Sequence, residues 1–182
     1  MPTPYFEKTM KSMKLKMQAL WGAFLIAPSI YAGVLYKITS NNIDPASAPA
    51  NDSFVYTLVI FSIMVVILSF FLPNFITKGL LSAIKSGKLS RDENIKQLLV
   101  SIKNRQELEK LSDKEIQDLR IIYAYFISFM LKIAMAESIA IYGLVLGIIN
   151  HELGIFLYFA IPSILLLVIH RPNIDRALNR MS

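Results

Sequence analysis

Four stretches of this 182-residue chain are long, apolar and almost free of charge, and they constrain the fold more than any other feature. A helix that crosses a membrane needs roughly 20 predominantly apolar residues, and a helix pairs its own backbone polar groups in hydrocarbon. We therefore expect an all-α, polytopic membrane protein with four transmembrane helices. The expected spans are about residues 17–37, 54–72, 123–149 and 153–170.

A soluble helix bundle is the alternative to this fold. Soluble helices of ordinary length show a polar face, but residues 54–72 (FVYTLVIFSIMVVILSFFL) show none. The whole chain is 54% hydrophobic, above the roughly 45–50% that is usual for soluble domains. Both observations favour the membrane protein.

The lysines and arginines gather on one side of the expected topology. Of the 19 in the chain, four precede residue 17, ten lie between residues 78 and 120, and three follow residue 170. Because cytoplasmic loops carry an excess of Lys and Arg, we expect both termini on the cytoplasmic side of the cytoplasmic (inner) membrane. The net charge of +6 is then mostly an orientation signal, and no nucleic-acid partner is expected.

Residue types that several kinds of chemistry require do not occur in the sequence. There is no cysteine, which excludes disulfides, thiolate nucleophiles and Cys-bound metal sites. His151-Glu152 is an isolated pair rather than a metal-binding motif, and the sequence holds no Gly-Lys-Ser/Thr phosphate loop. We therefore expect neither an enzyme nor a bound cofactor or metal.

The two halves of the chain resemble each other. Residues 26–36 (IAPSIYAGVLY) are similar to 135–146 (MAESIAIYGLVL), and 72–80 are similar to 171–178 around a shared Pro-Asn pair. Each half then holds two spans that start from the same side, which predicts two parallel helical-hairpin repeats. The expected domains are a first repeat, a helical cytoplasmic connector and a second repeat. Their boundaries are residues 1–80, 81–112 and 113–182.

Two capping boxes mark helix starts in the connector region. The first, Ser90 to Glu93, is followed by apolar residues at helical spacing and predicts a short amphipathic helix over 91–103. This helix would lie on the membrane surface, dock on its own chain or bind a partner. The second box, Ser112 to Glu115, predicts a helix over 113–149 that continues into the third span.

Glu137 is the single acidic residue inside the third span. It is expected ~15 Å from the inner edge, where a charge costs ~2.5–3.5 kcal/mol on insertion scales. Lys132 lies ~140° away around the helix, so it is not an obvious partner. Glu137 is then either neutral or bonded to a donor on another helix. Candidate donors in the chain are Ser29, Tyr31, Tyr36, Ser62, Tyr158 and Ser163.

Small residues form a stripe along the same helix. The stripe consists of Ala136, Ala140, Gly143 and Gly147, the last two of which form a GxxxG element. A similar stripe on the first span consists of Gly22, Ser29 and Gly33. Because small residues allow close helix approach in lipid, we expect the first and third spans to pack along these stripes.

The stretch AESIAIYGLVLGII, residues 136–149, resembles the carboxylate-bearing second helix of the proteolipid c subunit of rotary ATP synthases. In that family a mid-membrane Glu or Asp, followed by Tyr-Gly-Leu-Val, takes up and releases the transported proton. The resemblance is local, because the family's Gly-rich first helix and polar Arg-Gln-Pro-like loop do not occur in this sequence. It implies a protonatable carboxylate at Glu137, and it implies neither a ring nor rotation.

Two main functions follow from these observations. The first is a non-catalytic subunit or scaffold of a larger membrane complex, in which Glu137 is bonded across helices. Its partners would be the lipid bilayer and other membrane subunits or further copies of the chain. The alternative is a proton- or ion-translocating protein with Glu137 as the carrier and Lys132 and Tyr142 as modulators. The repeat also permits a small-molecule transporter.

Overall fold

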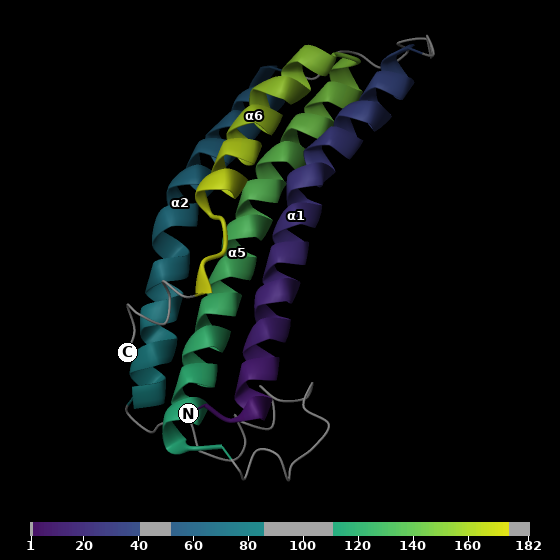
Figure 1. The fold of residues 1–182 in the computed structure, drawn as a ribbon. Helices are drawn as coiled ribbons and strands as arrows, with labels where there is room; N and C mark the ends of the chain where they lie inside the picture. The colour runs from purple at the N-terminus through teal and green to yellow at the C-terminus, as the bar shows by residue number, and fades with distance from the viewer. Residues whose placement is uncertain (1, 41–51, 86–110, 175–182) are drawn as a thin grey trace. The chain divides into compact units, whose positions relative to one another are not determined.

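The computed structural model describes residues 2–40, 52–85 and 111–174, and their regular structure is helical (Figure 1). The helices are α1 (Pro4–Ser40), α2 (Asp52–Lys85), α5 (Asp113–Asn150) and α6 (Leu153–Ile169). The all-helical prediction is therefore confirmed for this part of the chain. Helices α1, α2 and α5 are long and apolar enough to cross a membrane, whereas the apolar α6 has 17 residues.

Helix α5 begins at the predicted capping box. The backbone N–H of Glu115 donates to the Ser112 hydroxyl at 3.3 Å, and the backbone N–H of Ser112 donates to the Glu115 carboxylate at 2.8 Å. These bonds satisfy backbone donors that have no partner within the helix. The observed helix, Asp113–Asn150, confirms the prediction of a continuous helix over 113–149.

The turn between α5 and α6 depends on one residue in a left-handed conformation. His151 has φ of 52°, and the backbone N–H of Glu152 donates to the Gly147 carbonyl at 3.0 Å. This bond closes the last turn of α5 in the way that a residue with positive φ after a helix allows. Two residues, His151 and Glu152, therefore separate the end of α5 from the start of α6.

The described residues belong to two compact units, each with its own core. Of the described residues, the first holds 2–19, 73–85, 111–129 and 172–174, and the second holds 20–40, 52–72 and 130–171. Buried side chains of the first unit include Met17, Ile121, Ile122 and Phe129. Buried side chains of the second unit include Leu35, Ile139, Leu146, Phe156 and Leu167. The apolar residues of the chain are thus sufficient to build a core in each unit.

Helix α5 is the most enclosed of the three long helices. Of its most apolar stretch 44% is buried within the chain, against 11% in α1 and in α2. Large apolar side chains of α2 face outward, including Tyr56 at 67% exposure and Phe71 at 70%. A helix with apolar side chains on every face is typical of a protein core or a membrane span. Since little of α2 is buried within the chain, its composition is compatible with a multi-pass membrane protein.

Two of the sequence predictions concern residues that the structure does not describe. The amphipathic helix over 91–103 lies outside the described residues, as does most of the connector over 81–112. Of the motif at 171–178, only the first four residues are described. The internal repeat therefore stays a prediction.

Candidate functional site around Glu137

Glu137 lies on the buried face of α5 and bonds to α1. Its side chain is 6% exposed, and Tyr31 of α1 donates its phenolic hydroxyl to Glu137 Oε1 at 2.5 Å. Tyr31 is one of the six donors named from the sequence. It reaches Glu137 because α1 turns this face inward: Tyr31 also packs against a core cluster of Leu35, Phe156 and Ala160.

The second carboxylate oxygen of Glu137 is buried without a hydrogen-bond partner among the described residues. Ser163 on α6 is fully buried, and its hydroxyl also has no hydrogen-bond partner among the described residues. Gly143 of α5 lies against Phe159 of α6, which places Ser163 within about one helical turn of Glu137 along the helix axes. A buried polar group without a partner costs free energy. The oxygen atoms of Glu137 and Ser163 therefore make this region less stable than apolar side chains of the same size would.

Among the described residues, neither Lys132 nor Tyr142 forms a hydrogen bond with the Glu137 carboxylate. Within residues 2–40, 52–85 and 111–174, the hydrogen bond to the Glu137 carboxylate comes from Tyr31. Lys132 lies near His170 at the end of α6, close enough to interact electrostatically with its ring. Tyr142 is partly buried on α5. The structure thus gives a bonding partner on another helix for Glu137, and it does not link Lys132 or Tyr142 to that carboxylate by a hydrogen bond among the described residues.

The small residues of α5 are in close contact with neighbouring helices. A Cβ at Gly143 would lie 2.5 Å from Phe159 Cβ of α6, and one at Gly147 would lie 2.5 Å from Leu35 Cδ2 of α1. Ala136 and Ala140 are fully buried. The stripe of α5 therefore lies where helices approach closely, toward α6 at Gly143 and toward both α1 and α6 at Gly147.

The predicted stripe of α1 lies elsewhere than expected. A Cβ at Gly22 or Gly33 would meet no atom within 4 Å, and Ser29 is exposed. Helix α1 instead presents Tyr31 and Leu35 to the rest of the second unit. The inward face of α1 thus holds a hydrogen-bond donor to the buried carboxylate and a fully buried leucine rather than the small residues.

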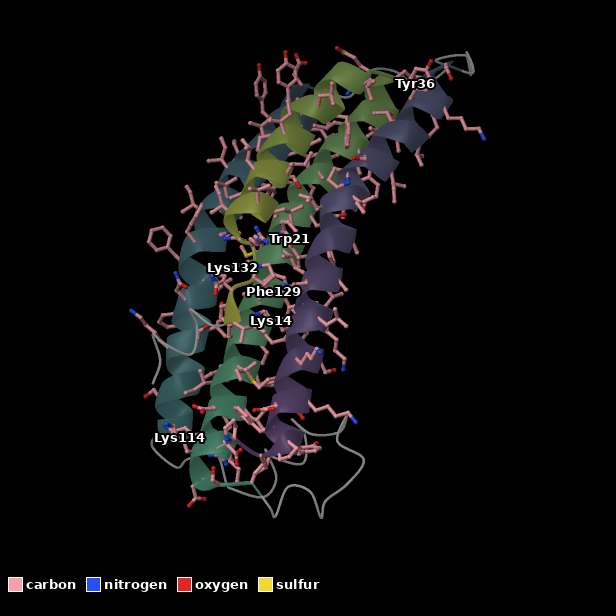
Figure 2. All side chains as sticks on the ribbon, in the orientation of Figure 1. Lys14, Trp21, Tyr36, Lys114, Phe129 and Lys132 are labelled. Atoms are coloured by element: carbon pink, nitrogen blue, oxygen red, sulfur yellow. The ribbon has the colours of Figure 1, made fainter. Side chains whose placement is uncertain are left out.

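A second polar group of side chains surrounds the C-terminal end of α6, and sequence reasoning did not find it. The Trp21 indole N–H donates to the Leu167 carbonyl at 2.8 Å, and the Arg171 guanidinium lies 5.7 Å from the centre of the Trp21 ring. His170, 8% exposed, lies 3.5 Å from the Ser69 hydroxyl through its Nε2 atom. Figure 2 shows Trp21 and Lys132 near this end of α6.

We call Lys132, His170 and Arg171 the basic cluster. The signal for it in the sequence was a Trp near the start of the first span and an Arg directly after the fourth, both typical of a membrane interface. The sequence does not show that Lys132 and His170, which are far apart in the chain, come close enough to interact electrostatically.

Comparison of the chain with protein-family models, with curated proteins and with solved structures finds no match. The two groups of residues are therefore interpreted from their own chemistry. Among the described residues, no three or more His, Cys, Asp or Glu side chains come together in a way that could hold a metal ion.

Proposed function

We propose that this chain is a small integral protein of the cytoplasmic membrane and a non-catalytic subunit of a larger membrane complex. It crosses the membrane four times as two parallel two-helix repeats, with both termini in the cytoplasm. Three long apolar helices support this topology. At 17 residues, α6 is ~25 Å long, which a bilayer with a hydrocarbon core of about 30 Å can accommodate by local thinning.

The observation that carries the proposal is the bond between Tyr31 and Glu137. The single carboxylate in the apolar part of α5 is bonded to another helix of the same chain. Hydrogen bonds between helices stabilise packing in lipid, where burial of apolar surface between helices contributes little. Glu137 then has a structural purpose that explains its place in an apolar helix without a transported ion.

The outward faces of the helices provide the surface for partners. Beside Tyr56 and Phe71 of α2, Tyr158 of α6 is 80% exposed and Ile30 of α1 is 59% exposed. Lipid covers such side chains at no cost, and a neighbouring membrane subunit covers them equally well. The proposed partners are therefore the bilayer, other membrane subunits and further copies of the chain.

Native mass measurement tests the proposed function. The tagged chain would be extracted from its own membrane in a mild detergent, purified and weighed as an intact complex. Other chains that co-purify in a fixed ratio would support the subunit. A monomer or a homo-oligomer of this chain alone would contradict it and would favour transport.

The topology has its own test, because the sequence holds no cysteine. The variants Lys8→Cys and Glu152→Cys would each carry one thiol, at the start of α1 and in the turn after α5. A thiol reagent that does not cross membranes should label the Glu152→Cys variant in intact cells. It should label the Lys8→Cys variant only after permeabilisation. Labelling of both variants in intact cells, or the reverse pattern, would contradict the proposed orientation.

Proton or ion translocation is the second candidate, and one observation favours it. Glu137 Oε2 has no partner among the described residues, and this oxygen is where a carrier would bind a proton. The local resemblance to the carboxylate-bearing helix of rotary ATP synthases supports the same role. Liposomes that contain the wild-type chain or Glu137→Gln would be compared with a pH-sensitive dye. Equal flux in both would exclude Glu137 as a carrier.

A further inference from the structure

The basic cluster carries positive charge in a place where the described residues offer no carboxylate to balance it. Lys132 is partly buried on α5, and Arg171 lies just beyond the end of α6. Within residues 2–40, 52–85 and 111–174, neither Lys132 nor Arg171 forms an ion pair. Lys132 is a partly buried cation without a counter-ion, which is costly, so an anionic ligand that reaches it would be stabilised. Arg171 is exposed and therefore accessible to the same ligand.

The side chains around the cluster are held in place. The indole of Trp21 is fixed by its bond to the Leu167 carbonyl, and Arg171 lies over the Trp21 ring. His170 is enclosed between the Ser69 hydroxyl and the edge of the Phe70 ring, whose centre lies 5.2 Å away. Trp21, His170 and Arg171 are thus each placed by a contact with a neighbouring group of the same unit.

The cluster also lies where an apolar surface ends. Val168 and Ile169, the last residues of α6, are 53% and 63% exposed, and the basic residues follow directly. In the topology proposed above, this end of α6 reaches the cytoplasmic leaflet. Trp and basic side chains at that depth are typical of the boundary between hydrocarbon and headgroups. A ligand with one anionic group and long apolar chains would contact both surfaces at once.

We propose that Lys132, His170 and Arg171, together with Trp21, bind the phosphate group of an anionic phospholipid of the cytoplasmic leaflet. The guanidinium and ammonium groups bind the phosphate oxygens, and the acyl chains lie along Val168 and Ile169. Basic pockets between transmembrane helices on the cytoplasmic side are known to bind such headgroups. This site rests on the proposed membrane insertion, but it does not depend on the identity of any subunit.

The test is lipid retention measured by native mass spectrometry on the full chain. The chain would be purified in mild detergent and mixed with equal amounts of phosphatidylglycerol and phosphatidylcholine. The wild type is expected to retain phosphatidylglycerol preferentially. Lys132→Gln combined with Arg171→Gln should lower that retention about 30-fold. Lys37→Gln, which removes an exposed charge from the last turn of α1, is the matched control and should leave retention unchanged.

Several results would overturn the site. The first is equal retention of the two lipids by the wild type. The second is a loss of retention in Lys37→Gln as large as in the double variant. The third is displacement of the lipid by millimolar sodium phosphate, which would indicate a site for a soluble anion. Arg171→Lys keeps the charge and should keep most of the retention even if the double variant fails to fold. Alkaline carbonate extraction separates the two proposals: release of the chain from membranes contradicts membrane insertion, whereas membrane-bound protein without lipid preference contradicts this site alone.

Discussion

Tyr31 of α1 and Glu137 of α5, which are 106 residues apart in sequence, are joined by a hydrogen bond of 2.5 Å between the phenolic hydroxyl and the carboxylate. The bond lies within the second unit, beside the core cluster of Leu35, Phe156 and Ala160. It explains how an acidic residue is accommodated in an apolar helix. It also adds a polar tie to the apolar contact between Leu35 of α1 and Gly147 of α5.

Removal of that hydroxyl should weaken the fold. We predict that Tyr31→Phe lowers the free energy of unfolding in detergent by about 1–2 kcal/mol, because a buried carboxylate oxygen loses its donor. The control is Tyr36→Phe on the same helix, since Tyr36 is 65% exposed, and it should change stability by less than about 0.5 kcal/mol. Equal effects of the two changes would show that the bond contributes nothing specific.

The glycines of α5 and α1 should respond differently to the same substitution. Gly143→Ala places a methyl group 2.5 Å from Phe159 Cβ and 3.1 Å from the Phe156 carbonyl oxygen, so we expect a loss of about 1–3 kcal/mol. Gly33→Ala meets no atom within 4 Å and should be neutral or stabilise α1 by up to about 1 kcal/mol. Thermal unfolding of the two variants in one detergent distinguishes them. A larger loss for Gly33→Ala would contradict the observed packing.

His151 is predicted to be a position that glycine would improve. Its φ of 52° lies in the left-handed region, which costs residues with a Cβ about 1–2 kcal/mol. His151→Gly should therefore raise the melting temperature or leave it unchanged, with a gain of up to about 1 kcal/mol. His151→Val should lower it, because a β-branched side chain tolerates this conformation poorly. Stabilisation by valine would contradict the observed end of α5.

The start of α5 should make stability depend on pH. Glu115 lies before the expected third span, and backbone N–H groups of Thr3 and Ser112 donate to its carboxylate, which lowers its pKa from 4.5 to about 2. Since the folded chain holds this proton less tightly than the unfolded chain, the stabilisation is present above about pH 4.5 and is lost as the pH falls toward 2. Unfolding would be followed by circular dichroism between these limits.

Two variants isolate the contribution of Glu115. Glu115→Gln removes the titrating group and should flatten this part of the pH profile, while Glu7→Gln changes an exposed carboxylate of α1 and should leave the acid-induced loss in place. If Glu115→Gln retained the full loss of stability between pH 4.5 and 2, another group would be responsible.

The helices were predictable because their signals are local. The capping box at Ser112 to Glu115 defines the start of α5 within a few residues, and the apolar stretches define where long helices run. The pairing of helices was less predictable, because it depends on which faces meet. Small residues at Gly22 and Gly33 suggested one face of α1, but Tyr31 and Leu35 occupy the inward face.

The candidate site was predictable only in part, because its acidic residue is a local signal and its partner is not. An acidic residue in an apolar stretch is visible in the sequence, and its need for a partner follows from physical chemistry. Which of six hydroxyl groups serves as donor depends on distances between helices that no sequence pattern encodes. The basic cluster depends on the same kind of distance, because Lys132 and His170 are far apart in sequence and come within electrostatic range only in the folded chain.

A double-mutant cycle on Tyr31 and Glu137 tests the central claim most directly. The free energy of unfolding in detergent would be measured for the wild type, Tyr31→Phe, Glu137→Ala and the double variant. If the carboxylate joins α1 to α5, the two residues should show a coupling energy of about 1 kcal/mol, within the range found for hydrogen bonds between membrane helices. A coupling energy of zero would contradict the claim that Glu137 holds these helices together.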